Sequence, residues 1–268
     1  MVKLPLMAHK NTNIRYHGNP PYLAAAVHGG PGGIGSANGL ARGLAEYCGV
    51  VEPLQGAYSV DAQAEELYRQ LSDVAPLVLI GHSWGAWLAL IAAARYPGLV
   101  RQLVLVGSGA LDAQYLPQLV GRRLAHFDEA ERKAYFDAID MLEQDSTDKD
   151  VHLQRLGQLA DKADTYSPLE IESEPVVNDG RMYAEVWPQA AEMRKSGELL
   201  SLFRRISCPL TVIHGDYDTT PPEGVTEPLK RAGIPFTPYI LKNCGHTPWR
   251  EKYARDDFFQ TLKLILDL

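Results

Sequence analysis

The stretch LVLIGHSWGAWLALIAAARYP (residues 77–97) contains a change of structural period. Its first four residues, Leu77–Ile80, form a short apolar run that is typical of a strand covered on both faces. From Trp84 onward the sequence is rich in alanine and leucine and has no breaker before Pro97, which indicates a buried helix. The pattern Gly-x-Ser-x-Gly at residues 81–85 therefore lies where we expect a strand to turn sharply into a helix.

Ser83 is the small polar residue at the tip of this predicted turn. The glycines on either side relieve crowding between strand and helix and leave the serine hydroxyl exposed, as in a nucleophile elbow. We therefore predict that Ser83 is a catalytic nucleophile. A strand–helix turn with an idle serine is the alternative interpretation.

Length and composition narrow the class of protein. The 268 residues fit one large α/β domain with an insertion, and the 46% of hydrophobic residues can form a sizeable core. The net charge is −7 and there is no basic block, so we expect no nucleic-acid partner. No apolar run suits a membrane span, and the first residues are too polar for a signal peptide, so we expect no membrane association and a cytoplasmic location.

The three cysteines, Cys48, Cys208 and Cys244, are odd in number and widely spaced. This spacing argues against a disulfide framework and against a structural zinc site. We expect no metal and no cofactor. Because Cys244 lies two residues before His246, we also consider that it makes the protein sensitive to thiol reagents.

Further strands and helices alternate along the chain, which predicts right-handed β-α-β crossovers and a mostly parallel sheet with helices on both faces. The expected strands are 23–27, 47–51, 77–80, 99–106, 209–214 and 236–241, and the expected helices of this core include 59–71 and 253–266.

Residues 111–206 interrupt this alternation. They contain no convincing buried strand and read as several helices, including 128–142 and a helix from Pro188 to Phe203. We predict a helical cap inserted into a core made of residues 1–110 and 207–268. Such a cap would cover the carboxyl ends of the strands, where open α/β sheets bind ligands.

A serine nucleophile needs a base and an orienting carboxylate. Asp216 and Asp218 follow one predicted strand and His246 follows the last, so these side chains meet Ser83 at the same edge of the sheet, in the order Ser, Asp, His. We predict His246 as the base and favour Asp218 over Asp216 as the acid. Four other histidines are weaker candidates for the base, and we interpret them as structural: His82, His126, His152 and His214.

Acyl transfer also needs amide donors for the developing oxyanion. The amide of Trp84 follows the nucleophile at a helix N-terminus, and the glycine-rich loop at 28–33 supplies the second donor, with Gly30 preferred and Gly29 the second choice. A phosphate-binding loop is the alternative, but the lysine and the spacing of such loops are absent from 28–33. The residues that we name as candidates to line the pocket, besides the side chain of Trp84, are His28, Gly29, Tyr217 and Trp249.

The chain resembles the α/β-hydrolase superfamily along nearly its whole length. The motifs HGGPGG (28–33), GHSWG (81–85), GDYD (215–218) and CGH (244–246) are similar to those of the proline iminopeptidase branch. The resemblance implies a Ser83, Asp218, His246 triad with oxyanion amides at Gly30 and Trp84. Residues 52–59, EPLQGAYS, depart from the D-x-R-G-x-G-x-S element of that branch.

We therefore expect a serine hydrolase that cleaves an ester or amide of a small molecule or short peptide. One alternative is an N-terminal aminopeptidase, whose cap glutamates would bind the substrate amine. The candidates Glu172, Glu174 and Glu185 match no motif, and we interpret them as solvated charges. Further alternatives are a lyase and a non-catalytic ligand-binding protein on the same fold. The oligomeric state is not predictable from the sequence.

Overall fold

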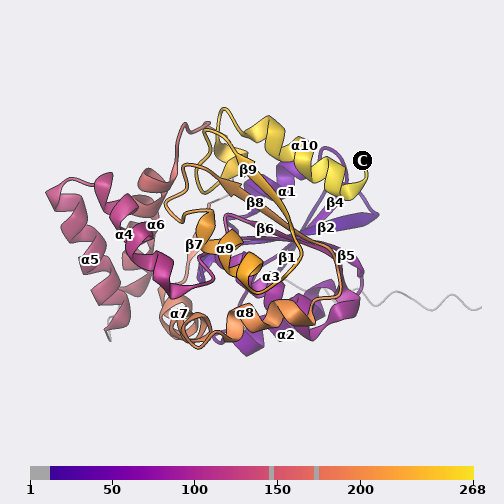
Figure 1. The fold of residues 1–268 in the computed structure, drawn as a ribbon, viewed down its shortest axis with the longest axis horizontal. Coiled ribbons are helices and arrows are strands. Elements are labelled where there is room, and N and C mark those ends of the chain that lie inside the picture. The colour runs from indigo at the N-terminus through magenta and orange to yellow at the C-terminus, as the bar shows by residue number, and fades with distance from the viewer. Residues whose placement is uncertain (1–12, 145–147, 172–174) are drawn as a thin grey trace, which may run out of the picture.

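The computed structural model describes residues 13–144, 148–171 and 175–268, and a seven-stranded sheet lies at its centre (Figure 1). The strand order is β1-β4-β2-β5-β6-β8-β9, with β1 antiparallel to β4 and every other neighbouring pair parallel. The strands of this sheet are β1 (Ile14–His17), β2 (Tyr22–Val27), β4 (Gly49–Pro53), β5 (Leu77–His82), β6 (Val100–Val106), β8 (Leu210–Gly215) and β9 (Thr237–Leu241). The predicted, mostly parallel α/β fold is confirmed.

Helices cover both faces of the sheet (Figure 1). One apolar cluster packs α1 and α10 against one face, and a second packs α2, α3, α9 and the short helix α8 (Glu198–Leu202) against the other. The helices of the core are α1 (Asn38–Leu44), α2 (Val60–Leu71), α3 (Trp84–Arg95), α9 (Glu223–Arg231) and α10 (Arg255–Leu266). Within the described ranges, no helix has both the length and the apolar character that a membrane span requires.

The segment between β6 and β8 is mostly helical. Its helices are α4 (Leu116–Ala125), α5 (Glu129–Glu143), α6 (Lys149–Asp164), α7 (Gly180–Lys195) and α8 (Glu198–Leu202). Helix α5 begins with the expected acidic cap, because the Asp128 side chain accepts the Glu131 amide and the Glu131 side chain accepts the Asp128 amide. We refer to residues 111–206 below as the inserted segment.

Two features of the inserted segment differ from the sequence prediction. Pro188 does not begin a helix; it lies inside α7, which begins at Gly180 after the Asp179 side chain accepts the Met182 amide. The N-cap at Asp179, nine residues upstream, thus outweighs the preference of proline for a first turn. The segment also contributes a short strand, β7 (Val177–Asn178), which pairs with β3 (Gly33–Ile34) of the core.

The sheet also differs at its edge, because β1 was not predicted. Its four residues, IRYH, lie antiparallel beside β4. They are only partly buried and too short and polar to give a clear strand period. The position of this strand depends on the buried carboxylate of Glu52, which accepts a hydrogen bond from His17 at 2.8 Å and pairs with Arg15.

The topology places two loops side by side at the centre of the sheet. Strand β2 lies between β4 and β5 in the sheet. After β2 the chain forms β4 on one side, and it then crosses over to form β5 on the other side of β2. This reversal is a topological switch point, where the loops that follow the two strands diverge and leave room for a ligand. The loop after β2 is the glycine-rich stretch 28–33, and the turn after β5 carries Ser83.

Two glycines allow α3 to pack closely against the sheet at this point. A Cβ atom at Gly81 would lie 2.1 Å from the carbonyl oxygen of Gly85, and a Cβ atom at Gly85 would lie 2.4 Å from that of Val27. Both contacts are to backbone atoms, which cannot move aside as a flexible side chain can. Any larger residue at either position would therefore force α3 away from the sheet.

We expect Gly85→Ala to lower the free energy of unfolding by about 2 kcal/mol or more, the range seen when a packed site is overfilled. Urea unfolding would measure the loss. Gly98→Ala is the matched control, because a Cβ atom there meets nothing within 4 Å. Equal stability of the two variants would contradict the packing argument.

Candidate active site

Ser83 has the backbone strain expected of a nucleophile elbow. Its φ is 55° and its ψ is −119°, a conformation that a residue with a side chain rarely adopts. The Ser83 amide donates to the carbonyl of Val106 at 3.0 Å, which ties the turn to the end of β6. The side chain makes no capping bond to α3, so the hydroxyl is available for chemistry.

Asp218 and His246 meet at the same edge of the sheet. His246 Nδ1 donates to Asp218 Oδ2 at 2.7 Å, and Asp218 is fully buried. Because Nδ1 carries the hydrogen, Nε2 is the ring nitrogen free to accept a proton. Both Ser83 and His246 adjoin the loop after β6: Ser83 bonds Val106, and a Cβ atom at Gly107 would lie 3.2 Å from His246 Nδ1.

The two candidate acids have different surroundings. Asp216 is exposed, and its carboxylate lies 3.4 Å from Lys242 Nζ. Asp218 also accepts the Thr220 amide at 2.8 Å and lies 3.2 Å from His214 Nε2. The structure thus pairs Asp218, and not Asp216, with His246, while His214 is a contact of the acid that sequence reasoning treated only as the end of a strand.

The charges of this group shift its pKa values in opposite directions. Burial opposes ionisation of Asp218, but the charges and hydrogen bonds of His246 and His214 outweigh it and hold the pKa of the carboxyl well below its usual value. Burial likewise favours the neutral form of His246, but the charge and hydrogen bond of Asp218 outweigh it and raise the pKa of the imidazole. Asp218 is therefore ionised at neutral pH, and His246 is a stronger base than an ordinary histidine.

His82, next to the nucleophile, supports the histidine loop. Its Nε2 donates to the carbonyl of His246 at 2.9 Å, and the two rings lie 4.7 Å apart. Burial lowers the pKa of His82 to about 3, so this second imidazole stays neutral beside His246. The prediction of a structural role fits these contacts.

The glycine-rich loop is held by a second buried, neutral histidine. His28 Nδ1 donates to the carbonyl of Gly29 at 2.8 Å, and its Nε2 accepts the Gln55 amide at 3.2 Å. The ring is fully buried, so His28 fixes the loop rather than lining a pocket. The amide of Gly29 donates to Ser36 Oγ at 3.1 Å, which favours Gly30 over Gly29 as a donor to a bound oxyanion.

The Trp84 amide is the other predicted oxyanion donor. It opens α3, so it has no acceptor one turn earlier in the helix, and the helix dipole favours negative charge there. Its indole is 2% exposed and donates to Gln63 Oε1, so the side chain belongs to the core and does not line a pocket.

Two further pocket candidates lie elsewhere. Trp249 is 1% exposed and packs against His82 and Phe258, which makes it a core residue beneath the histidine loop. Tyr217 faces the inserted segment, with its ring 5.5 Å from His126 and 5.1 Å from Tyr166. From the sequence alone, an aromatic residue beside a site motif that packs in the core cannot be distinguished from one that contacts a substrate.

Residues of the inserted segment bond directly to the acid and base loops. Arg122 Nη1 donates to the carbonyl of Asp218 at 3.0 Å. The backbone carbonyl of Asp164 accepts the His246 amide at 2.8 Å, while its buried carboxylate pairs with Arg123 at 2.6 Å and accepts the Thr219 hydroxyl. Sequence reasoning missed these positioning residues, because each looks like an ordinary helix charge.

Glu251 fixes the other side of the histidine loop. This buried carboxylate accepts the amides of Gly245 and Tyr166 at 2.8 Å each and of Ser167 at 2.7 Å. Leu169 donates to the carbonyl of Arg250, and Lys252 donates to that of Ser167. Residues 164–169, near the middle of the inserted segment, are thus paired with residues 245–252.

The remaining sequence candidates do not join the site. Cys244 is fully buried, and burial together with nearby carboxylates raises the pKa of its thiol, which opposes reaction with thiol reagents. Glu185 is exposed and pairs with Arg181 at 2.7 Å. Glu172 and Glu174 lie outside the described residues.

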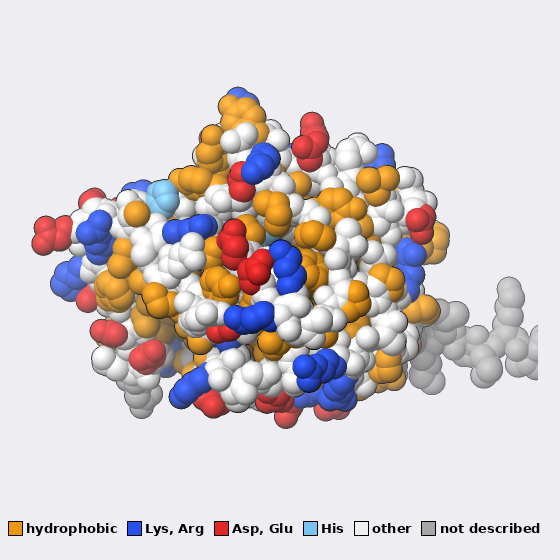
Figure 2. Space-filling view, in the orientation of Figure 1, with side chains coloured by type: hydrophobic (Ala, Val, Ile, Leu, Met, Phe, Trp, Pro, Cys, Tyr) orange, Lys and Arg blue, Asp and Glu red, His pale blue; other side chains and the backbone are white. Residues whose placement is uncertain are grey.

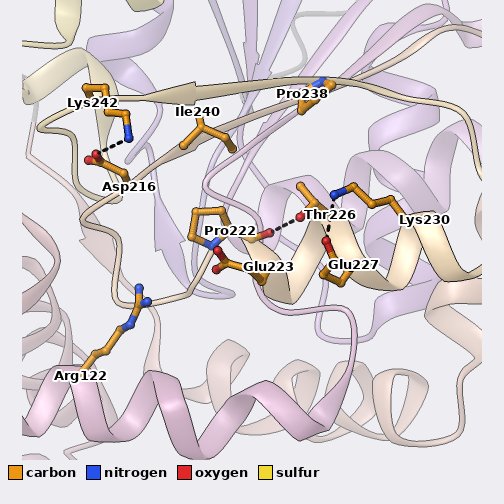
Figure 3. A pocket seen from close by; sticks show the side chains of 10 residues that line it. All are labelled: Arg122, Asp216, Pro222, Glu223, Thr226, Glu227, Lys230, Pro238, Ile240 and Lys242. Carbon is orange, nitrogen blue, oxygen red and sulfur yellow. Dashed lines mark hydrogen bonds and ion pairs between the residues drawn. The ribbon is translucent and has the colours of Figure 1, made fainter.

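A surface groove of about 370 Å³ lies apart from these groups, between α9, β9 and Arg122 of α4 (Figure 3). Its charges pair with one another: Lys242 with Asp216 at 3.4 Å and Lys230 with Glu227 at 2.9 Å. Acidic and basic side chains also lie next to one another on the face of the molecule seen in Figure 2. Neither Ser83 nor His246 lines this groove.

The chain belongs to the α/β-hydrolase fold family, because the family model described as "alpha/beta hydrolase fold" matches residues 52–252. Solved structures that are similar in fold include VinJ (TM-score 0.64, 18% identity, 95% of this chain and 94% of that chain). Others are a thermophilic esterase from Thermogutta terrifontis (0.60, 18%, 95% and 92%) and a bromoperoxidase from Bacillus anthracis (0.60, 16%, 95% and 95%). No curated protein sequence matches the chain.

The family and its esterase and hydrolase neighbours support a hydrolase. The identities are low, so these structures share the fold and do not define the substrate.

The neutral histidines make stability depend on pH. Burial lowers the pKa of His28 from 6.5 to about 4 in the folded protein. As the pH falls, His28 therefore takes up a proton in the unfolded chain before it does so in the folded protein. The stability that is present above pH 6.5 is lost as the pH falls toward 4. Between pH 7 and pH 5 we expect His28 alone to cost about 2 kcal/mol. Urea unfolding at pH 7 and pH 5 should show that His28→Asn loses about 2 kcal/mol less stability over this range than the wild type does. A wild-type slope in His28→Asn would contradict a neutral His28.

Proposed function

We propose that the protein is a serine hydrolase that cleaves an ester or amide bond of a small molecule through an acyl-enzyme. Ser83 is the nucleophile, His246 the general base and Asp218 the acid that orients it. The observation that carries the proposal is the 2.7 Å bond from His246 Nδ1 to the buried carboxylate of Asp218, at the sheet edge where Ser83 has a strained backbone.

The mechanism follows from the tautomer of His246. Nε2 takes the proton from Ser83 Oγ as the oxygen attacks the substrate carbonyl, and Asp218 stabilises the imidazolium that forms. The amides of Gly30 and Trp84 bind the oxyanion. His246 then returns the proton to the leaving group, and a water molecule activated by the same imidazole releases the acid product.

The inserted segment acts in this proposal as a cap over residues 1–110 and 207–268. The bonds of Arg122 and Asp164 to the loops of Asp218 and His246 support this arrangement, because they hold the segment against the catalytic edge. The substrate would enter between the cap and the core.

An aminopeptidase of the proline iminopeptidase type is the second candidate, favoured by the motifs HGGPGG and GHSWG. That activity would need an unpaired cap carboxylate to bind the substrate amine. Glu185 is exposed and already paired with Arg181, so it does not meet this requirement.

We expect a fluorophosphonate probe to label the wild-type protein and not Ser83→Ala, because the probe requires an activated serine. Initial rates on short p-nitrophenyl esters and on proline p-nitroanilide, measured side by side, then separate the two candidates. Ester cleavage alone supports an acyl hydrolase, and fast, Ser83-dependent anilide cleavage supports the aminopeptidase. Absence of both labelling and turnover would overturn the proposal and favour a binding protein.

We expect Asp218→Asn to lower kcat/KM by about 10³- to 10⁴-fold. The acid limb of the pH–rate profile should also move to lower pH, because the carboxylate that raises the pKa of His246 is lost. Asp216→Asn is the matched control and should change kcat/KM by no more than about twofold, since Asp216 is exposed. An unmoved acid limb in Asp218→Asn would show that another acid orients the base.

A further inference from the structure

Arg194 lies in an aromatic cluster where α7 packs near α3. Its guanidinium is 5.3 Å from the ring centre of Trp87 and 5.7 Å from that of Trp187. The two indoles are stacked at 5.7 Å with their planes 12° apart, and Tyr183 stacks on the other side of Trp187 at 6.0 Å. Figure 1 shows α7 and α8 side by side on the face of the sheet covered by α3.

The Arg194 guanidinium has no anionic partner among residues 13–144, 148–171 and 175–268. Its Nε is buried and has no hydrogen-bond acceptor, and no carboxylate pairs with it there. Burial lowers the pKa of Arg194, which is the sign of a cation held without compensation. Arg123, which is also partly buried, pairs by contrast with Asp164 at 2.6 Å.

A cation in such surroundings is costly, because stacking on the indoles replaces only part of its lost hydration. Arginine presents a fork of N–H donors that matches a carboxylate, and here several of those donors are unused. The side chain is only partly buried, so a ligand can reach it.

The cluster is connected to the catalytic edge through Trp87. This residue lies one helical turn after Ser83 in α3, and its Nε1 donates to the carbonyl of Gly109 at 3.1 Å. Gly109 belongs to the loop after β6, where Gly107 contacts His246. The buried Trp87 side chain thus separates Arg194 from the loop that adjoins both Ser83 and His246, so Arg194 lies one side chain away from that loop.

We propose that Arg194 binds a carboxylate of the substrate, so that the natural substrates are anionic esters or amides, with the partly exposed ring of Trp187 contacting the apolar part between the carboxylate and the scissile bond. The proposal rests on the proposed function and deepens it. In this proposal the inserted segment contributes a positive side chain that selects a negatively charged substrate. An aminopeptidase would instead need a negative side chain there to bind the positively charged amine of its substrate.

Two matched pairs of esters test the proposal and locate the carboxylate. On the acyl side, the mono-p-nitrophenyl ester of adipic acid is compared with its neutral methyl diester. On the leaving-group side, 4-acetoxybenzoate is compared with its methyl ester. Loss of one bidentate, charge-assisted contact in Arg194→Met should reduce kcat/KM for the anionic member of one pair by about 10- to 100-fold, mainly through KM, and leave its neutral partner within about twofold.

Lys195→Met is the matched control, because it removes the next positive charge along the same helix from a side chain that is 79% exposed. It should leave both pairs unchanged. An equal loss on anionic and neutral esters in Arg194→Met, accompanied by a lower Tm, would indicate a packing role and overturn the proposal. Absence of selectivity between charged and neutral esters in the wild type would also overturn it.

A binding measurement separates this proposal from the catalytic one. Adipate should quench or shift the tryptophan fluorescence of Ser83→Ala, and the added Arg194→Met substitution should abolish the response. If this response is present but no ester is hydrolysed and no serine is labelled, the catalytic proposal fails while the anion site stands. If esters are hydrolysed but adipate gives no response dependent on Arg194, the anion site fails alone.

Discussion

The close approach of backbone to backbone at Gly81 and Gly85 is the constraint on which the site depends. With no side chain at either position, α3 begins almost in contact with β5 and with the carbonyl of Val27 at the end of β2. Ser83 must then adopt a strained conformation between them, and the Trp84 amide follows it as the first of α3. The geometry of Ser83 is thus determined by packing of the main chain, and the serine itself contributes only its small size and its hydroxyl.

Buried carboxylates hold the other loops at this edge of the sheet in place. Asp218, Asp164 and Glu251 are buried carboxylates, and each accepts hydrogen bonds from groups that belong to different parts of the chain. A buried carboxylate without such donors would be very unfavourable, so the donors and the loops that carry them are held in one arrangement. The neutral rings of His28 and His82 complete it without adding positive charge that would lower the basicity of His246.

The sequence allowed prediction of those features that depend on local order. Ser83, Asp218 and His246 each follow a strand, and parallel strands bring their carboxyl ends together, so their convergence could be predicted before any contact was known. Asp164 and Glu251 could not be identified, because nothing near them in the chain distinguishes a carboxylate that will bind distant amides from one that faces solvent. The start of α7 was misplaced for a similar reason: Pro188 suggested a boundary, while the cap at Asp179 determined it.

The pairing between residues 164–169 and 245–252 has a mechanical consequence. The inserted segment is attached near its middle to the same short stretch of chain that carries the His246 imidazole, through the Asp164 carbonyl and the carboxylate of Glu251. Any motion that lifted the segment here would displace His246 as well. The bonds that hold this part of the segment against the core are therefore the same bonds that hold the His246 loop in place.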